Sequence, residues 1–183
     1  GLARGMYDGL MGKHLMLYLP GTPLATSLAA VGWDGAIRST AGDYALVVDS
    51  NIGFNKANAL VNEQFSYEVT LAADLTASAQ MTMKYRHLGG VDAAPCIQQV
   101  LIFGPSTTYD QLMNTCYWDY LRLYVPRGTT LVDSTKLPIP AYEMLNKLAS
   151  DGRAEILADD SGKDAFATLF VVKRGDQQDL HFK

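Results

Sequence analysis

The sequence predicts an α+β fold that is mainly antiparallel, sandwich-like β structure with a few short helices. Several segments alternate apolar and polar residues with a period of two, which is typical of half-buried strands. The helical segments are short and inserted among the strands instead of alternating with them, which favours an antiparallel arrangement. Hydrophobic residues make up 48% of the 183 residues, so the chain can bury a core.

Residues 1–40 predict a small helix–strand–helix element that packs on the main domain. Apolar residues at helical spacing predict a helix over 2–12. A strand over 14–19 follows and stops at a proline. A second short helix then runs from about residue 22 and ends at Gly32.

Residues 41–183 predict the antiparallel β-rich domain. An uninterrupted apolar run over 44–48 suits a strand buried on both faces. Alternation over 65–72 and 80–86 predicts an antiparallel hairpin. A capping-box pattern at Thr108 predicts a short helix that ends near residue 115.

The last part of the chain predicts one helix and several strands. Pro140 suits the first turn of a helix over 140–150, and Gly152 suits the position after its end. Pro138 and Pro140 equally suit a loop. The predicted strands are 116–125, which is rich in aromatic residues, 129–132, 153–158, 164–173 and 178–183.

Composition excludes several classes of protein. The net charge is −4 and the sequence has no basic run, which argues against nucleic-acid partners. No apolar stretch reaches the roughly 18–20 residues of a membrane-spanning helix, so we expect no direct membrane insertion by this segment. The chain begins at Gly1 and ends in a predicted strand. We therefore expect a fragment of a longer chain, with any export signal or anchor upstream.

The chain contains two cysteines, Cys96 and Cys116. A disulfide between them would close a loop of about 20 residues and stabilise the fold by roughly 3 kcal/mol. It would fix residues 97–115 to the start of the aromatic strand. The alternative is two buried free thiols, as in many cytosolic domains. No metal site is expected, because neither cysteine has a CxxC partner or a nearby histidine.

A polar loop after the apolar run is a candidate binding or metal site. Its oxygen-bearing side chains are Asp49, Asn51, Asn55 and Asn58. The start of the loop partly resembles a calcium-binding loop, but Glu63 lies three positions beyond the offset of the bidentate glutamate and Lys56 adds a positive charge. The alternatives are a hydrogen-bonded turn with Gly53 at positive φ and a binding loop for a partner chain or glycan.

The aromatic strand is a candidate interaction face. Alternation places Trp118, Tyr120 and Tyr124 on one side of this strand. If this face is exposed, its rings can stack on sugars or pack against a neighbouring domain. Core packing is the alternative.

The sequence predicts no catalytic residue and no cofactor. The three histidines are scattered, and no nucleophile elbow, zinc-protease motif or phosphate-binding loop is present. Asp119, in the aromatic strand beside Arg122, is interpreted as part of a strand-face ion pair or an edge position.

With these residues in view, the chain resembles the C-terminal part of an uncharacterised bacterial cell-surface family, the domain of unknown function 4012. The resemblance spans most of residues 10–130, and the matching blocks are 14–18, 32–35, 43–58 and 116–128. It implies an outward-facing polypeptide, often encoded near envelope polysaccharide genes, with a membrane helix and another domain upstream of Gly1. It also implies the Cys96–Cys116 bridge. It implies no activity and no catalytic residue.

We therefore expect a non-enzymatic, extracytoplasmic domain of a bacterial envelope protein that acts in binding, adhesion or assembly, with a protein or glycan of the envelope as partner. The first alternative is an enzyme or accessory factor in surface-polysaccharide processing, completed by an N-terminal half. Carboxylates clustered in an open cleft would favour it. The second alternative is a scaffold subunit of a larger membrane-associated assembly. An apolar patch over 116–125, or open strand edges at 14–19 or 178–183, would favour that.

Overall fold

The computed structural model describes residues 1–38, 40, 42–91, 93–100, 107–158 and 162–183. The chain divides into two units: Gly1–Ala41 with Asp160–Gly162, and Gly42–Asp159 with Lys163–Lys183. The described residues contain three short α-helices and seven strands in two open antiparallel sheets. The predicted α+β class is confirmed.

The N-terminal unit contains α1 (Leu2–Met11) and α2 (Leu24–Ala30). Both helices were predicted, but the strand expected over 14–19 is wrong. This segment is an irregular connection in which the Leu17 N–H donates to the Trp33 carbonyl at 2.8 Å. An apolar run of this length forms a strand only beside a partner strand, and the described residues of this unit contain none.

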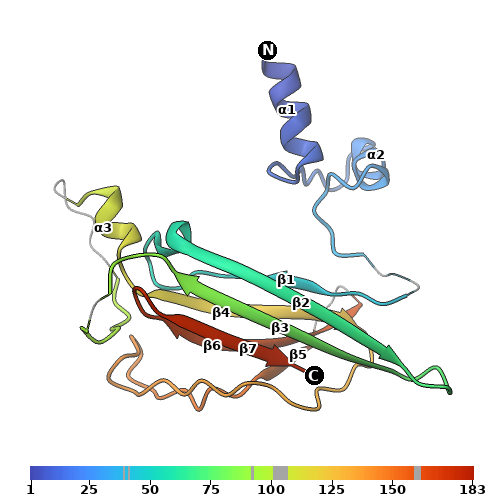
Figure 1. The fold of residues 1–183 in the computed structure, drawn as a ribbon. Coiled ribbons are helices and arrows are strands. Elements are labelled where there is room, and N and C mark those ends of the chain that lie inside the picture. The colour runs from blue at the N-terminus through green and yellow to red at the C-terminus, as the bar shows by residue number, and fades with distance from the viewer. Residues whose placement is uncertain (39, 41, 92, 101–106, 159–161) are drawn as a thin grey trace. The chain divides into compact units, whose positions relative to one another are not determined.

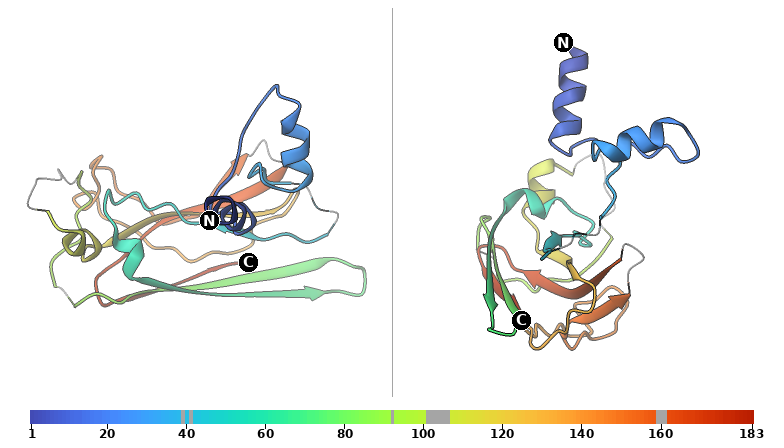
Figure 2. Two further views of the ribbon diagram at one scale, coloured as in Figure 1. Left: turned by 90° about the horizontal axis from the view of Figure 1, so that it is seen from above. Right: turned by 90° about the vertical axis from the view of Figure 1, so that its right-hand side faces the viewer.

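The β-rich unit is built from two sheets that lie as facing layers (Figures 1 and 2). One has the strand order β1-β4-β6-β5 and the other the order β2-β3-β7, with every neighbouring pair antiparallel. The strands are β1 (Leu46–Val48), β2 (Val61–Leu71), β3 (Ala77–His87), β4 (Tyr117–Pro126), β5 (Glu155–Ala158), β6 (Lys163–Val172) and β7 (Gln177–Phe182). A 3₁₀ turn, η1 (Ala57–Leu60), and α3 (Tyr109–Met113) lie at one end of the sheets (Figure 1).

The core lies between the two sheets. Its centre is formed by Met83 and Tyr85 of β3, Leu121 of β4 and Phe170 of β6, all fully buried. A second cluster covers the outer face of β4, where Trp118 packs with Cys96, Ile139 and Met144. Both faces of β4 are therefore covered, and this strand fixes the position of the disulfide beside it.

Local sequence signals located the hairpin and the capped helix correctly. β2 and β3 form the predicted hairpin, which pairs continuously from Val61–His87 to Leu71–Ala77. Both arms of the capping box are formed, since the Thr108 hydroxyl accepts from the Gln111 N–H at 3.3 Å and the Gln111 side chain accepts from the Thr108 N–H at 2.9 Å.

The helix predicted over 140–150 is wrong. The segment consists of turns whose two ends are joined by an isolated antiparallel bridge between Ile139 and Ser150. Packing of Ile139 and Met144 on Trp118 holds it against the outer face of β4. The loop interpretation of the two prolines describes this segment, because tertiary packing outweighs a weak helical pattern.

Two other strand predictions also need correction. Residues 129–132 form no strand; instead the Val132 N–H donates to the Lys183 carbonyl at 2.6 Å. The apolar run 44–48 contains only a three-residue strand, β1, whose residues are half-buried and not covered on both faces. Its position at the edge of its sheet explains why it is not fully covered.

Candidate functional site

The predicted disulfide between Cys96 and Cys116 is present, with the two Cα atoms 5.8 Å apart. Cys96 is buried in the cluster around Trp118, and Cys116 directly precedes β4. The bridge therefore links an irregular segment to the start of β4, a largely buried strand.

The polar loop after β1 forms a network of hydrogen bonds within itself and to the disulfide. The Asn51 amide donates to the side-chain oxygens of Asn55 at 3.0 Å and Asn58 at 3.3 Å. The Asn51 side-chain oxygen accepts from the Gly53 N–H at 2.9 Å. The Asn55 amide donates to the Cys116 carbonyl at 3.0 Å. The hydrogen-bonded turn, one of the alternatives above, describes these asparagines.

The loop differs from expectation in one backbone angle. The residue at positive φ is Phe54, at 54°, and not Gly53. Among the described residues, no group of three or more His, Cys, Asp or Glu side chains could hold a metal ion.

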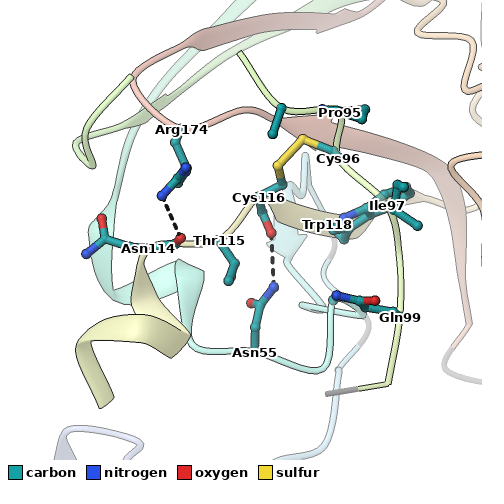
Figure 3. A pocket seen from close by; sticks show the side chains of 12 residues that line it. Asn55, Pro95, Cys96, Ile97, Gln99, Asn114, Thr115, Cys116, Trp118 and Arg174 are labelled. Carbon is teal, nitrogen blue, oxygen red and sulfur yellow. Dashed lines mark hydrogen bonds between the residues drawn. A yellow bond between two sulfur atoms is a disulfide. The ribbon is translucent and has the colours of Figure 1, made fainter. Parts of the chain in front are cut away.

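Three separately predicted features meet at one cavity of about 320 Å³ (Figure 3). The polar loop, the disulfide and the aromatic strand contribute Asn55, Cys96, Cys116 and Trp118. Arg174 closes one side and donates to the Asn114 carbonyl at 3.2 Å. The cavity therefore presents amide groups and a guanidinium around a disulfide.

The aromatic face is mostly part of the core. Trp118 and Tyr124 are only 2% and 6% exposed. Tyr120 is half-buried, and its hydroxyl donates to Glu155 at 3.2 Å. Core packing therefore describes Trp118 and Tyr124, and Trp118 offers no open face on which a sugar could stack.

A buried carboxylate, Asp119, lies between the sheets beside the half-buried Asp49, and sequence reasoning missed this arrangement. Asp119 is 0% exposed, and its carboxylate interacts with Asp49, the Tyr117 side chain and the Ser50 backbone. Asp49, at the start of the polar loop, accepts from the Tyr85 hydroxyl at 2.6 Å. Burial and the neighbouring Asp49 raise the pKa of Asp119 to about 8. Burial and Asp49 also raise the pKa of Glu63.

The ion pair expected between Asp119 and Arg122 is absent. Residues three apart on a strand point to opposite faces, so Asp119 faces the core while the Arg122 guanidinium donates to the Ser50 hydroxyl at 3.3 Å. The available signal was alternation with Tyr117 and Leu121, which places Asp119 on the apolar face. Asp119 therefore lies in the core, whereas Asp49 is half-buried.

We expect the variant Asp119→Asn to be more stable than the wild type at pH 8.5 by several kcal/mol, because each pKa unit of the shift corresponds to about 1.4 kcal/mol. The pKa of Asp119 is raised from 3.8 to about 8 in the folded state, so its contribution to stability is fully present below about pH 4 and is lost as the pH rises towards 8. The two proteins should therefore have equal stability near pH 4. Urea unfolding across this pH range measures the difference.

The exposed Asp151 provides the control for this experiment. The variant Asp151→Asn removes a carboxylate whose side chain is 70% exposed, so it should change the stability by at most about 1 kcal/mol. A constant difference between Asp119→Asn and the wild type from pH 4 to 8.5 would contradict the assigned pKa shift.

A larger cavity, which we call the hairpin groove, opens between the sheets at the opposite end from the disulfide. Its volume is about 900 Å³, and it is lined by the β2–β3 hairpin, the turn after β4 and the end of β7. Phe166 and Phe182 belong to its buried lining. Tyr67, Val69 and Leu71 of β2 point into it yet remain 37%, 42% and 67% exposed.

These β2 side chains remain exposed because the two sheets differ in length. β2 and β3 continue to the tip of the hairpin, where strands of the facing sheet no longer lie opposite them (Figure 1). Alternation in the sequence identified the apolar face of β2 but carries no information about what covers it.

Comparisons with known proteins add no identification. No family model, curated protein or solved structure matches this chain.

Proposed function

We propose that this chain is a non-enzymatic, extracytoplasmic domain of a bacterial envelope protein that acts in assembly by binding a protein segment at the hairpin groove. The observation that carries the proposal is the row of apolar side chains on β2 that faces the core side of its sheet without cover. Contiguous apolar surface of this kind marks interaction sites in folded proteins.

The disulfide supports an extracytoplasmic location, since such bonds persist in oxidising compartments and are rare in the cytosol. The upstream membrane anchor and N-terminal domain implied by the family resemblance belong to the same proposal. Within the described residues, no helix has the length and apolar character needed to cross a membrane.

The chemistry of the groove favours a protein over a glycan as the partner. Its lining is dominated by apolar side chains from both sheets, including Val69 and Met81 of one sheet and Phe166 of the other. Sugar recognition depends on dense hydrogen bonding, whereas apolar side chains of a protein segment can fill such a groove. An enzyme of polysaccharide processing would need carboxylates in an open cleft, whereas Asp119 is fully buried.

The scaffold alternative is supported by the open edge of β2, but not by the strand edges expected at 14–19 and 178–183. The edge of β7 is covered, since Val132 and Thr135 donate to the carbonyls of Lys183 and His181 at 2.6 and 3.1 Å. β2 is an edge strand of eleven residues that is paired on one side only among the described strands. Assembly through β2 therefore combines the binding and scaffold hypotheses.

Photo-crosslinking in cells tests the proposal. A photoreactive amino acid at Val69 should form adducts with an extracytoplasmic protein, because this side chain lies in the groove. The same group at Gln80 of β3 should form few adducts, because Gln80 is exposed on the opposite face of this sheet and does not line the groove. Equal crosslinking at both positions, or none at Val69 in the folded protein, would reject the groove as a binding surface.

A further inference from the structure

The four sheet edges of the β-rich unit differ in how they are protected. β1 and β5 are short, with three and four residues, and β7 is covered by the segment after β4. β2 is eleven residues long, and within the described residues β3 is its one strand partner. Natural edge strands are commonly blunted by lysine, proline or a bulge. β2 contains no lysine or proline, and its pairing with β3 has no interruption.

The backbone groups along the outer edge of β2 can be assigned from its pairing with β3. The Leu88 N–H donates to the Leu60 carbonyl, and the Ala72 N–H donates to the Thr76 carbonyl. Even-numbered residues of β2 therefore direct their backbone groups towards β3. Because these directions alternate in an antiparallel strand, the odd-numbered residues, which also carry the exposed apolar row, present their N–H and C=O groups at the open edge.

β2 is complementary to a second copy of itself. When two antiparallel copies are centred on Ser66, Phe65 lies opposite Tyr67, and the apolar rows of both copies join on one face. The only charged side chains of β2 are Glu63 and Glu68. In this register Glu63 lies opposite Val69, and Glu68 lies opposite Gln64. The pairing therefore avoids the repulsion between like charges that destabilises strand pairs.

We propose that two copies of this chain associate through antiparallel β2–β2 pairing centred on Ser66. The outward N–H and C=O groups of Glu63, Phe65, Tyr67 and Val69 would form the backbone hydrogen bonds between the copies. The result is one continuous sheet with three strands from each copy. The apolar rows of the two β2 strands then lie next to each other on one face of this sheet. This inference rests on the proposed assembly function and names the partner as a second copy.

A cysteine at the symmetry centre tests both the pairing and its register. Ser66 would face Ser66 of the other copy in a non-hydrogen-bonded pair, with Cα atoms about 4.5 Å apart, a separation that a disulfide spans. On mild oxidation Ser66→Cys should give a covalent dimer on a non-reducing gel. The matched control is Thr70→Cys on the same face of β2. It should remain uncrosslinked, since the two Thr70 residues would lie about 27 Å apart.

Val69→Pro in the Ser66→Cys background removes an outward N–H without touching the β3 pairing, and should lower the crosslinked fraction at least tenfold. Sedimentation of the wild-type chain over a concentration series should show dimers, and circular dichroism confirms folding of each variant.

A wild-type chain that stays monomeric, or equal crosslinking of Thr70→Cys and Ser66→Cys, overturns the proposal. If the chain is monomeric and the photoreactive group at Val69 captures a different protein, the homodimer proposal is rejected and the proposed binding at the hairpin groove stands. If the chain is monomeric and Val69 forms no adduct, both proposals are rejected.

Discussion

Replacing Gly152 with alanine is expected to lower the free energy of unfolding by about 4 kcal/mol. Gly152 has a φ of 71°, and a Cβ at this position would overlap the backbone of Leu137. Backbone atoms cannot move aside as a flexible side chain can, so the loop between Leu137 and Gly152 would have to open. Urea denaturation measures the loss.

The effect should extend to the cluster on the outer face of β4. Ile139 and Met144, both within this loop, cover Trp118, so the fluorescence of Trp118 should shift as its ring becomes exposed to water. Gly128→Ala is the matched control, since Gly128 has a φ of 86° and no atom within 4 Å of the added Cβ. It should cost about 1 kcal/mol through the backbone angle alone. Equal losses for the two variants would contradict the steric explanation.

Removing the disulfide is expected to lower the free energy of unfolding by roughly 3 kcal/mol. The double variant Cys96→Ala, Cys116→Ala frees a loop with a sequence separation of 20 residues. Because the Asn55 amide donates to the Cys116 carbonyl, hydrogen exchange of the polar loop should increase as well. Thermal or urea unfolding measures the first effect.

Reduction of the wild type provides the control for this variant. A reducing agent should lower the stability of the wild type to that of the double variant, and should leave the double variant unchanged. Intact mass after alkylation of the denatured protein tests the location. Two adducts only after reduction support an extracytoplasmic protein, whereas two adducts without reduction remove the main physical support for it.

The sequence alone determined those elements whose signals are local. The alternation that predicts the β2–β3 hairpin depends on neighbouring side chains and holds in the structure. The capping box at Thr108 is likewise contained within four residues. The sequence limited any disulfide within the chain to Cys96 and Cys116, but the fold decided between a bridge and two free thiols by placing the two Cα atoms 5.8 Å apart.

Tertiary structure decided which faces and edges are covered. Asp119 is buried because both faces of β4 are covered, and the groove beside Val69 is open because the facing sheet ends earlier. The segments 14–19 and 140–150 lack their predicted structure because neither a partner strand nor helical packing is present for them. Periodicity specifies the face of an element, but burial depends on chain segments far away in sequence, and a single local pattern contains no information about those segments.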